Sequence, residues 1–289
     1  MTREHLMIVM AGDKSVHENN IKGNRNFDVW VVYYGNDDDV ARRYSETADR
    51  FWRAKGMKVE LLRDIIVRDL HFRQNFDFTC YKYVFMPDDD IIFDGVDAVN
   101  AFLDACTATG ADCAQPAISN NYWSHVSTQK VDQIAAHSVN WIEIMMPAYR
   151  SDLFQNAFIP VVHQLDFLVS GFGIEIMVQK LCETHRRRPT KNLILDSHAV
   201  VHSRPVGTNK AIHARGELEA FFIPQRQWMF GMKTLREFKS LDEAAAFVPS
   251  DYKEIFFEKA VVEEGISKYK PLIDLNIMRR SITSKFGVR

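Results

Sequence analysis

Continuous apolar runs of strand length alternate with stretches of helical spacing over most of the chain. The run at residues 6–11 ends at a Gly-Asp pair, and the run at residues 27–34 ends at a Gly-Asn-Asp turn. Such runs are typical of strands that are buried on both faces. Between residues 38 and 55, apolar positions instead recur as on one face of a helix. The same criteria predict strands at residues 57–61, 81–86, 112–117, 141–149 and 199–202, and helices at residues 65–75, 97–109, 151–168 and 174–182.

Strands separated by helical stretches predict an α/β fold, with a parallel, right-handed sheet flanked by helices. Beyond residue 217 the sequence changes to amphipathic, charged stretches rich in Phe, with one Trp. We therefore expect an α/β domain over residues 1–215 and a helical C-terminal extension over residues 216–289. The aromatic residues of the extension are expected to pack between helices. A dimer surface and peripheral attachment to a membrane are the alternatives for them.

Composition excludes several classes of protein. The 289 residues include 36 Lys and Arg against 38 Asp and Glu, and 46% are hydrophobic, so disordered, collagen-like and coiled-coil chains are excluded. The near-neutral balance argues against a protein dedicated to nucleic acid. Four cysteines without a C-x-x-C pair indicate reduced, mostly buried thiols. Because we find neither a signal-peptide pattern nor an apolar run long enough to span a membrane, we expect a cytoplasmic protein.

A local basic segment contrasts with the overall balance. Residues 184–215 contain seven Lys or Arg and a single acidic residue, which suggests an anion site. We expect the Arg run at residues 186–188 to be a solvated loop. Arg204, Lys210 and Arg215 are candidates for a loop that closes over a diphosphate.

Three consecutive aspartates follow the strand predicted at residues 81–86. In open α/β sheets, ligands bind at the carboxyl ends of the strands. Crowded carboxylates at that edge predict a hard divalent cation, Mg²⁺ or Mn²⁺. In an extended chain, Asp88 and Asp90 point the same way and can share one ion or its water shell, while Asp89 points away, toward a ribose. The alternative is a solvated turn, as we expect for residues 37–39, which are typical of a helix N-cap.

The order of the motifs along the chain resembles the GT-A glycosyltransferases. It is similar in particular to a poorly characterised family of GT-A-like proteins of plants and bacteria, over roughly residues 6–207. The acidic triplet matches the Asp-x-Asp motif of that fold. The segments that carry the resemblance are residues 27–35, 83–90, 115–117, 141–147, 171–175, 195–197 and 201–202.

The resemblance implies a mixed, mainly parallel sheet flanked by helices, and a metal-dependent nucleotide-sugar site within residues 1–215. Asp88 and Asp90 would hold Mn²⁺ or Mg²⁺ on the diphosphate of the donor, and His202 would complete the metal shell. His198, four residues earlier on the same predicted strand, is a weaker candidate. The donor-binding residues implied for base, ribose and phosphates are Ala11, Gly12, Asp13, Lys58, Asp88, Asp89 and Arg204.

Glu175 occupies the position at which the resemblance implies a catalytic carboxylate. It would deprotonate the acceptor hydroxyl in an inverting reaction, although Asp is expected there at least as often as Glu. The alternative is a carboxylate that favourably meets the dipole of a helix N-terminus. Glu143 is either an acceptor-binding carboxylate or a paired buried residue.

These observations predict a glycosyltransferase that moves a sugar from a nucleotide-sugar donor, with a UDP-sugar favoured, to an acceptor hydroxyl. A glycan or a lipid-linked acceptor is expected, and a homo-oligomer is compatible with the sequence. Two alternatives stay open. A sugar nucleotidyltransferase would need a Gly-rich basic loop after the first strand. Residues 12–15, with one Gly and one Lys, match such a loop only weakly. A non-catalytic nucleotide-sugar-binding protein could keep the same fold.

Overall fold

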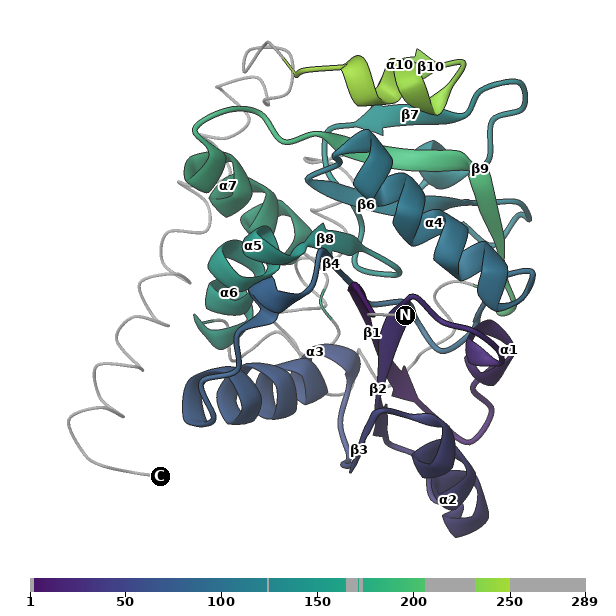
Figure 1. Cartoon of the computed structure of the whole chain (residues 1–289), viewed down its shortest axis with the longest axis vertical. Helices are drawn as coiled ribbons and strands as arrows, with labels where there is room; N and C mark the ends of the chain where they lie inside the picture. The colour runs from purple at the N-terminus through teal and green to yellow at the C-terminus, as the bar shows by residue number, and fades with distance from the viewer. Residues whose placement is uncertain (1–2, 124, 165–170, 172–173, 206–231, 250–289) are drawn as a thin grey trace, which may run out of the picture. The chain divides into compact units, whose positions relative to one another are not determined.

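The computed structural model describes residues 3–123, 125–164, 171, 174–205 and 232–249, all within the first of the two units into which the chain divides, Met1–Ser250. They form a ten-stranded sheet with helices on both faces (Figure 1). The strands are β1 (His5–Ala11), β2 (Phe27–Tyr33), β3 (Arg50–Arg53), β4 (Tyr83–Phe85), β5 (Ile91–Ile92), β6 (Cys113–Ile118), β7 (Ala136–Val139), β8 (Ala148–Arg150), β9 (Asn192–His202) and β10 (Thr234–Phe238).

The strand order is β10-β7-β9-β6-β8-β4-β1-β2-β3, with β5 paired to β9. The pairs β1–β2, β2–β3, β1–β4 and β6–β9 are parallel, whereas β8 runs antiparallel to both β4 and β6. Strands β5, β7 and β10 add further antiparallel pairs. The predicted α/β fold with a mixed sheet is confirmed. Because β4 and β6 run in the same direction on either side of β8, the carboxyl ends of β1, β4, β6 and β9 lie at one edge of the sheet.

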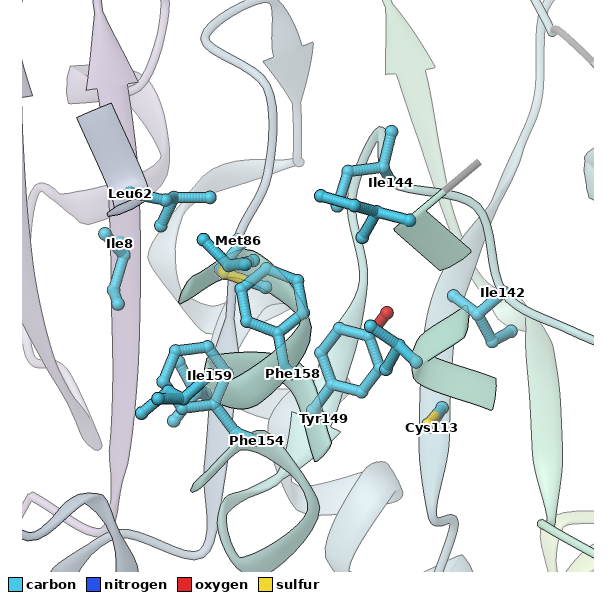
Figure 2. Close-up of a cluster of buried hydrophobic side chains, with 14 of the residues drawn as sticks. Ile8, Leu62, Met86, Cys113, Ile142, Ile144, Tyr149, Phe154, Phe158 and Ile159 are labelled. Atoms are coloured by element: carbon cyan, nitrogen blue, oxygen red, sulfur yellow. The ribbon is translucent and has the colours of Figure 1, made fainter. Parts of the chain in front are cut away.

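Each face of the sheet has its own apolar core. One core, part of which is drawn in Figure 2, joins the sheet to helices η1, η4, α6 and α7. The other joins it to α1, α2, α4 and α10. The helices of the first core are η1 (Leu62–Arg73), η4 (Phe154–Phe158), α6 (Ile159–Gln164) and α7 (Ile174–Arg186), and those of the second are α1 (Glu18–Ile21), α2 (Asp38–Thr47), α4 (Gly95–Thr109) and α10 (Leu241–Ala246).

Helix α2 begins as predicted and ends early. The Asp37 carboxylate accepts hydrogen bonds from the amides of Asp39 and Val40, so the predicted N-cap is confirmed. The helix ends at Thr47, and residues 50–53, predicted as helix, form β3. A strand is favoured here because Trp52 packs edge-on against Trp30 of β2, which no continued helix would allow.

The strand predicted at residues 57–61 is wrong. The segment is α3 (Lys58–Leu61), which continues directly into the π-helix η1. The helix is favoured because the Glu60 carboxylate accepts a 2.8 Å hydrogen bond from the amide of Met57, capping the first turn. Residues 65–75 are helical as predicted as far as Arg73.

The strand predicted at residues 141–149 is also largely wrong. Only its end belongs to a strand, β8, and residues 141–147 form a buried loop. Carbonyls of this loop bond outside the sheet ladder, since Ile144 and Met145 accept hydrogen bonds from Lys58. The strand predicted at residues 199–202 is the end of a longer strand, β9 (Asn192–His202). Strands β5, β7 and β10 were not predicted.

Part of the predicted helical extension belongs to the sheet. Thr234–Phe238 is strand β10 rather than helix, and it pairs with β7. The Arg236 guanidinium lies 5.5 Å from the ring centres of Phe238 and Phe247, which holds this edge together. Residues 206–231 and 250–289 lie outside the described residues, so the boundary at residue 215 and the role of the aromatic extension stay predictions.

Three of the four cysteines, Cys106, Cys113 and Cys182, are buried as predicted, and Cys80 is exposed. Among the described residues, no helix combines the length and the apolar character needed to cross a bilayer.

Candidate functional site

The carboxyl edge of the sheet gathers residues from distant parts of the chain. Gly12 follows β1, the acidic triplet follows β4, and His202 ends β9. Arg204, two residues past β9, also reaches this edge. The sequence placed each of these residues after a strand, and the topology makes their strands share one edge. The three aspartates are adjacent in sequence, but each is bound to a different segment.

Asp89 is bound to the loop after β1. Its carboxylate accepts hydrogen bonds from the Gly12 amide at 2.8 Å and from the Tyr34 hydroxyl at 3.0 Å. Arg204 Nη1 lies 3.5 Å from its other oxygen. Burial raises the pKa of Asp89, and these donors offset part of the rise. The Asp89 backbone carbonyl also accepts a hydrogen bond from the Val16 amide. Asp89 therefore binds the loop after β1 at two points, Gly12 and Val16.

The hydrogen bonds around Asp89 require a glycine at position 12. A Cβ at this position would lie 2.8 Å from the Tyr34 ring, whose hydroxyl is already committed to Asp89. A side chain here would push the ring away and break that bond. The conformation of this loop therefore depends on the absence of a side chain at position 12.

Asp90 and His202 form a pair. His202 Nε2 lies 3.3 Å from Asp90 Oδ2, and His202 Nδ1 lies 2.6 Å from the carbonyl oxygen of Tyr122. The carbonyl holds Nδ1 as the donor, which orients Nε2 toward the carboxylate. Burial lowers the pKa of His202, but Asp90 and the Tyr122 carbonyl outweigh this and raise it overall. Asn120 fixes the backbone of His202 through two further hydrogen bonds.

Asp90 Oδ1 is buried and has no hydrogen-bond partner among the described residues. A buried carboxylate oxygen without a donor is costly unless a cation completes its environment. Carboxylate oxygen suits Mg²⁺ and Mn²⁺, and imidazole nitrogen is a common ligand of divalent transition-metal cations. The pair thus fits a divalent cation as two of its ligands.

Asp88 is held by Lys58. Lys58 Nζ lies 2.6 Å from Asp88 Oδ1 and also donates to the carbonyl oxygens of Met86, Ile144 and Met145. Burial raises the pKa of Asp88, and Lys58 opposes the rise. Within the part of the chain that the structure describes, no three His, Cys, Asp or Glu side chains are gathered closely enough to hold an ion. Asp88 therefore does not join Asp90 and His202 in a three-ligand cluster.

The remaining donor-binding candidates, Ala11 and Asp13, flank Gly12 in the chain. Ala11 is buried at the end of β1, and its carbonyl accepts from the Tyr34 amide. The Asp13 carboxylate accepts from the Tyr33 hydroxyl and from the amides of Asn36 and Asp37. These donors lower the pKa of Asp13. Asp13 thus ties β1 to the turn after β2, and its contact with a nucleoside stays a prediction.

Glu175 lies in the first turn of α7 and is 1% exposed. Gly171, just before the helix, has φ +105°, and a Cβ there would lie within 3.0 Å of Val59 and Ile144. The carbonyl of Ile144 accepts from Lys58, the partner of Asp88. The start of α7 is therefore at the same edge as the acidic triplet. Glu143 is also buried, in the loop that contains Ile144.

The basic segment divides into structural and site residues. Arg186 and Arg188 are not a solvated loop, because both pair with buried Asp112, at 3.3 Å and 2.8 Å. Arg187 between them is exposed. Arg204 is brought to Asp89, whereas Lys210 and Arg215 lie outside the described residues. The remaining metal candidate of this segment, His198, has its Nδ1 bonded to Ser197 Oγ.

Sequence reasoning missed three residues around this site. Tyr34 and Asn120 orient Asp89 and His202 through hydrogen bonds. Both follow the carboxyl end of a strand, and that position was the available signal. Gln115 is a buried amide inside β6, and a lone polar residue within an apolar run was its signal.

No known protein family and no curated protein matches this chain. Among solved structures, it is similar to the mannosyltransferase PcManGT from Pyrobaculum calidifontis, determined with GDP-Man and Mn²⁺. The identity is 12%, the TM-score 0.47, and the match covers 98% of this chain and 81% of that chain. It is also similar to S. aureus TarS, at 12% identity and a TM-score of 0.47 over 80% of this chain and 44% of that one. The 1–349 fragment of TarS matches with a TM-score of 0.43 and 12% identity, over 69% and 59% of the two chains.

Proposed function

We propose that this chain is a metal-dependent glycosyltransferase of the GT-A type, which transfers a sugar from a nucleotide-sugar donor to an acceptor hydroxyl. The observation that carries the proposal is the pair of Asp90 and His202. There, a buried carboxylate oxygen with no hydrogen-bond partner among the residues that the structure describes lies beside an imidazole nitrogen that a carbonyl orients toward it. The pair lies at the sheet edge at which α/β folds bind ligands.

We propose that different residues of this edge contact the metal, the phosphates and the nucleoside of the donor. Asp90 and His202 are the proposed ligands of Mn²⁺ or Mg²⁺, and Asp88 is proposed to contact the water shell of the ion. Arg204, whose guanidinium is partly exposed, is proposed to contact a phosphate of the donor. The loop of Ala11, Gly12 and Asp13 is proposed to lie beside the nucleoside, and a UDP-sugar is the favoured donor.

A divalent cation at this position would supply positive charge to the diphosphate that departs from the sugar. Glu175 is proposed to accept the proton of the acceptor hydroxyl in an inverting reaction. In a retaining reaction the same carboxylate would stabilise positive charge on the transferred sugar. Lys58 is proposed to orient Asp88 and to neutralise part of the acidic triplet, because its ammonium bonds to the Asp88 carboxylate and to three backbone carbonyls.

The sugar nucleotidyltransferase alternative is less well supported. Such an enzyme needs loop amides after the first strand that are directed at a triphosphate. Here the Gly12 and Val16 amides donate to Asp89, and the Ser15 amide donates to the Gly12 carbonyl. These amides are engaged within the protein.

Calorimetric titration of UDP, and then of GDP, into the full chain with and without Mn²⁺ tests the proposal. We expect one nucleotide to bind in a Mn²⁺-dependent way, and Asp90→Asn and His202→Gln to weaken this binding by at least about tenfold. Asp39→Asn, in the exposed acidic run that caps α2, is the matched control and should bind like the wild type. Failure of both nucleotides to bind, with or without Mn²⁺, would contradict the proposal.

A further inference from the structure

Gln115 is a fully buried amide in the middle of β6. Its exposed fraction is 0%, and neither Oε1 nor Nε2 has a hydrogen-bond partner among the described residues. Buried side-chain amides are nearly always paired, because losing water without gaining a bond is unfavourable. An apolar side chain would avoid this cost. The amide therefore has unused capacity for one ligand that both donates and accepts hydrogen bonds.

The face of the sheet on which Gln115 lies is known from the strand alternation. Cys113 and Ala117, two residues away on either side, belong to the core of Figure 2, whereas Ala114 and Ile118 belong to the opposite core. Gln115 thus lies on the face that α7 covers. Tyr149 of β8 pairs in register with Cys113 and belongs to the same core.

Helix α7 crosses this face antiparallel to β6. Near its end, Arg186 pairs with Asp112, just before β6, and the Cys182 thiol interacts with that of Cys113. From Cys182 back to Glu175 the helix advances about 10 Å. From Cys113 to Gln115 the strand advances about 7 Å in the same direction. The first turn of α7, which carries Glu175, therefore lies over the part of β6 that contains Gln115.

Two polar side chains thus face one region below the start of α7. Glu175 is within electrostatic range of Tyr149, whose partner in register is two residues from Gln115. A carboxylate accepts hydrogen bonds, and an amide both donates and accepts them. Adjacent hydroxyl groups on a sugar ring have the complementary pattern.

We propose that Gln115 binds a hydroxyl of the acceptor next to the one that Glu175 deprotonates. The acceptor is then a sugar or polyol with neighbouring hydroxyls, rather than an isolated alcohol of a lipid or a protein side chain. The assignment of the bound sugar as acceptor rests on the proposed function. The presence of a sugar-binding amide at Gln115 does not.

Calorimetry on the full chain tests this with the methyl α-D-glycosides of glucose, galactose and mannose, and with cyclohexanol as a ring that has one hydroxyl. The variant is Gln115→Met, which keeps the volume and removes the amide. The matched control is Gln179→Met on α7. Gln179 is also buried, but its amide is bonded to Glu183, Thr190 and Asn192.

At least one glycoside should bind the wild type more tightly than cyclohexanol does. Gln115→Met should weaken that binding by about tenfold or more, because a buried amide then loses its ligand. Its melting temperature should equal or exceed that of the wild type, since no protein bond is lost, whereas Gln179→Met should melt lower. Its affinity for the donor nucleotide should not change.

Two results would overturn the inference. One is the absence of glycoside binding to the wild type. The other is a melting temperature of Gln115→Met as low as that of Gln179→Met, which would show that a buried water completes the amide as part of the fold. Glycoside binding without nucleotide binding would reject the proposed transferase and leave the Gln115 site standing. Nucleotide binding without glycoside binding would reject the Gln115 site alone.

Discussion

Lys58 Nζ lies 2.6 Å from Asp88 Oδ1, so one carboxylate of the acidic triplet is neutralised by a protein side chain. The same ammonium donates to three backbone carbonyls, two of them in the loop before β8. Lys58 begins α3, which means that one side chain joins a helix N-terminus, a strand end and a loop. The sequence makes Lys58 a phosphate-binding candidate. In the structure its ammonium contacts Asp88, and a contact with a phosphate stays a prediction.

Lys58→Met should lower the free energy of unfolding by about 2 kcal/mol, because Asp88 loses its cation and the carbonyls of Met86, Ile144 and Met145 lose a donor, although Met145 still accepts from the Asp88 amide. Chemical denaturation measures the loss. Lys82→Met is the control, since its partner Glu4 is about as exposed as Lys82 itself, and it should cost less than about 1 kcal/mol. Equal costs for the two variants would show that Lys58 is an ordinary surface lysine.

Gly12→Ala should lower the free energy of unfolding by about 1–3 kcal/mol, because the added methyl displaces the Tyr34 ring and breaks its bond to Asp89. In a Tyr34→Ala background the methyl meets no ring, so the same substitution should cost less than half as much. Urea denaturation of the two single variants and the double variant gives the coupling. Additive costs would mean that Gly12 and Tyr34 act independently.

His5 makes the stability depend on pH. It is fully buried, neither ring nitrogen has a hydrogen-bond partner among the described residues, and burial lowers its pKa to about 4, while Asp104 and Glu4 oppose the shift. The folded pKa is below the unfolded value of 6.5, so the unfolded state binds more protons between these values. The stabilisation is complete above pH 6.5 and is lost as the pH falls toward 4.

His5→Phe should therefore gain stability relative to the wild type as the pH falls, by up to about 1.4 kcal/mol per pH unit between pH 6.5 and pH 4. Thermal and urea unfolding at pH 7, 6 and 5 measure the difference. His185→Gln, at an exposed position, should follow the wild-type profile. A constant difference between His5→Phe and the wild type would show that His5 is protonated without penalty in the folded state.

Elements that are determined by neighbouring residues alone, such as a continuous apolar run or a helix-capping aspartate, could be predicted from the sequence. The apolar runs before Gly12 and before the acidic triplet are strands, and Asp37 caps α2. Parallel strands then place their ends at one edge, so Asp89, Asp90, His202 and Arg204 could be assigned to one site before any contact was known.

The errors occur where a distant partner decides between two local patterns. Met57, Val59 and Leu61 alternate as in a strand, yet Glu60 caps a helix and Lys58 bonds to carbonyls up to 87 residues away. In the same way, Trp52 is in a strand because it packs on Trp30. Spacing alone contains neither contact.

The chemistry of the acidic triplet was only partly predictable. The sequence shows three carboxylates, and strand alternation separates Asp89 from its neighbours. That Asp88 is bound to Lys58 depends on where α3 lies against the loop, which residue types do not reveal. Gln115 was noted only as part of a motif, because its missing partner is visible only when its surroundings are known.

The three aspartates are bound to three segments that reach the site at different stages of chain growth. Lys58 in α3 and Gly12 after β1, which bind Asp88 and Asp89, are synthesised before the triplet. His202 and Arg204 follow it by more than one hundred residues. On a growing chain, β1 to β4 can pair while Asp90 still has no partner. The site is completed only when β9 pairs with β6, and non-local pairing of this kind generally slows folding. The pairing of Asp90 with His202 is thus acquired last, so shortened or partly folded chains do not display it.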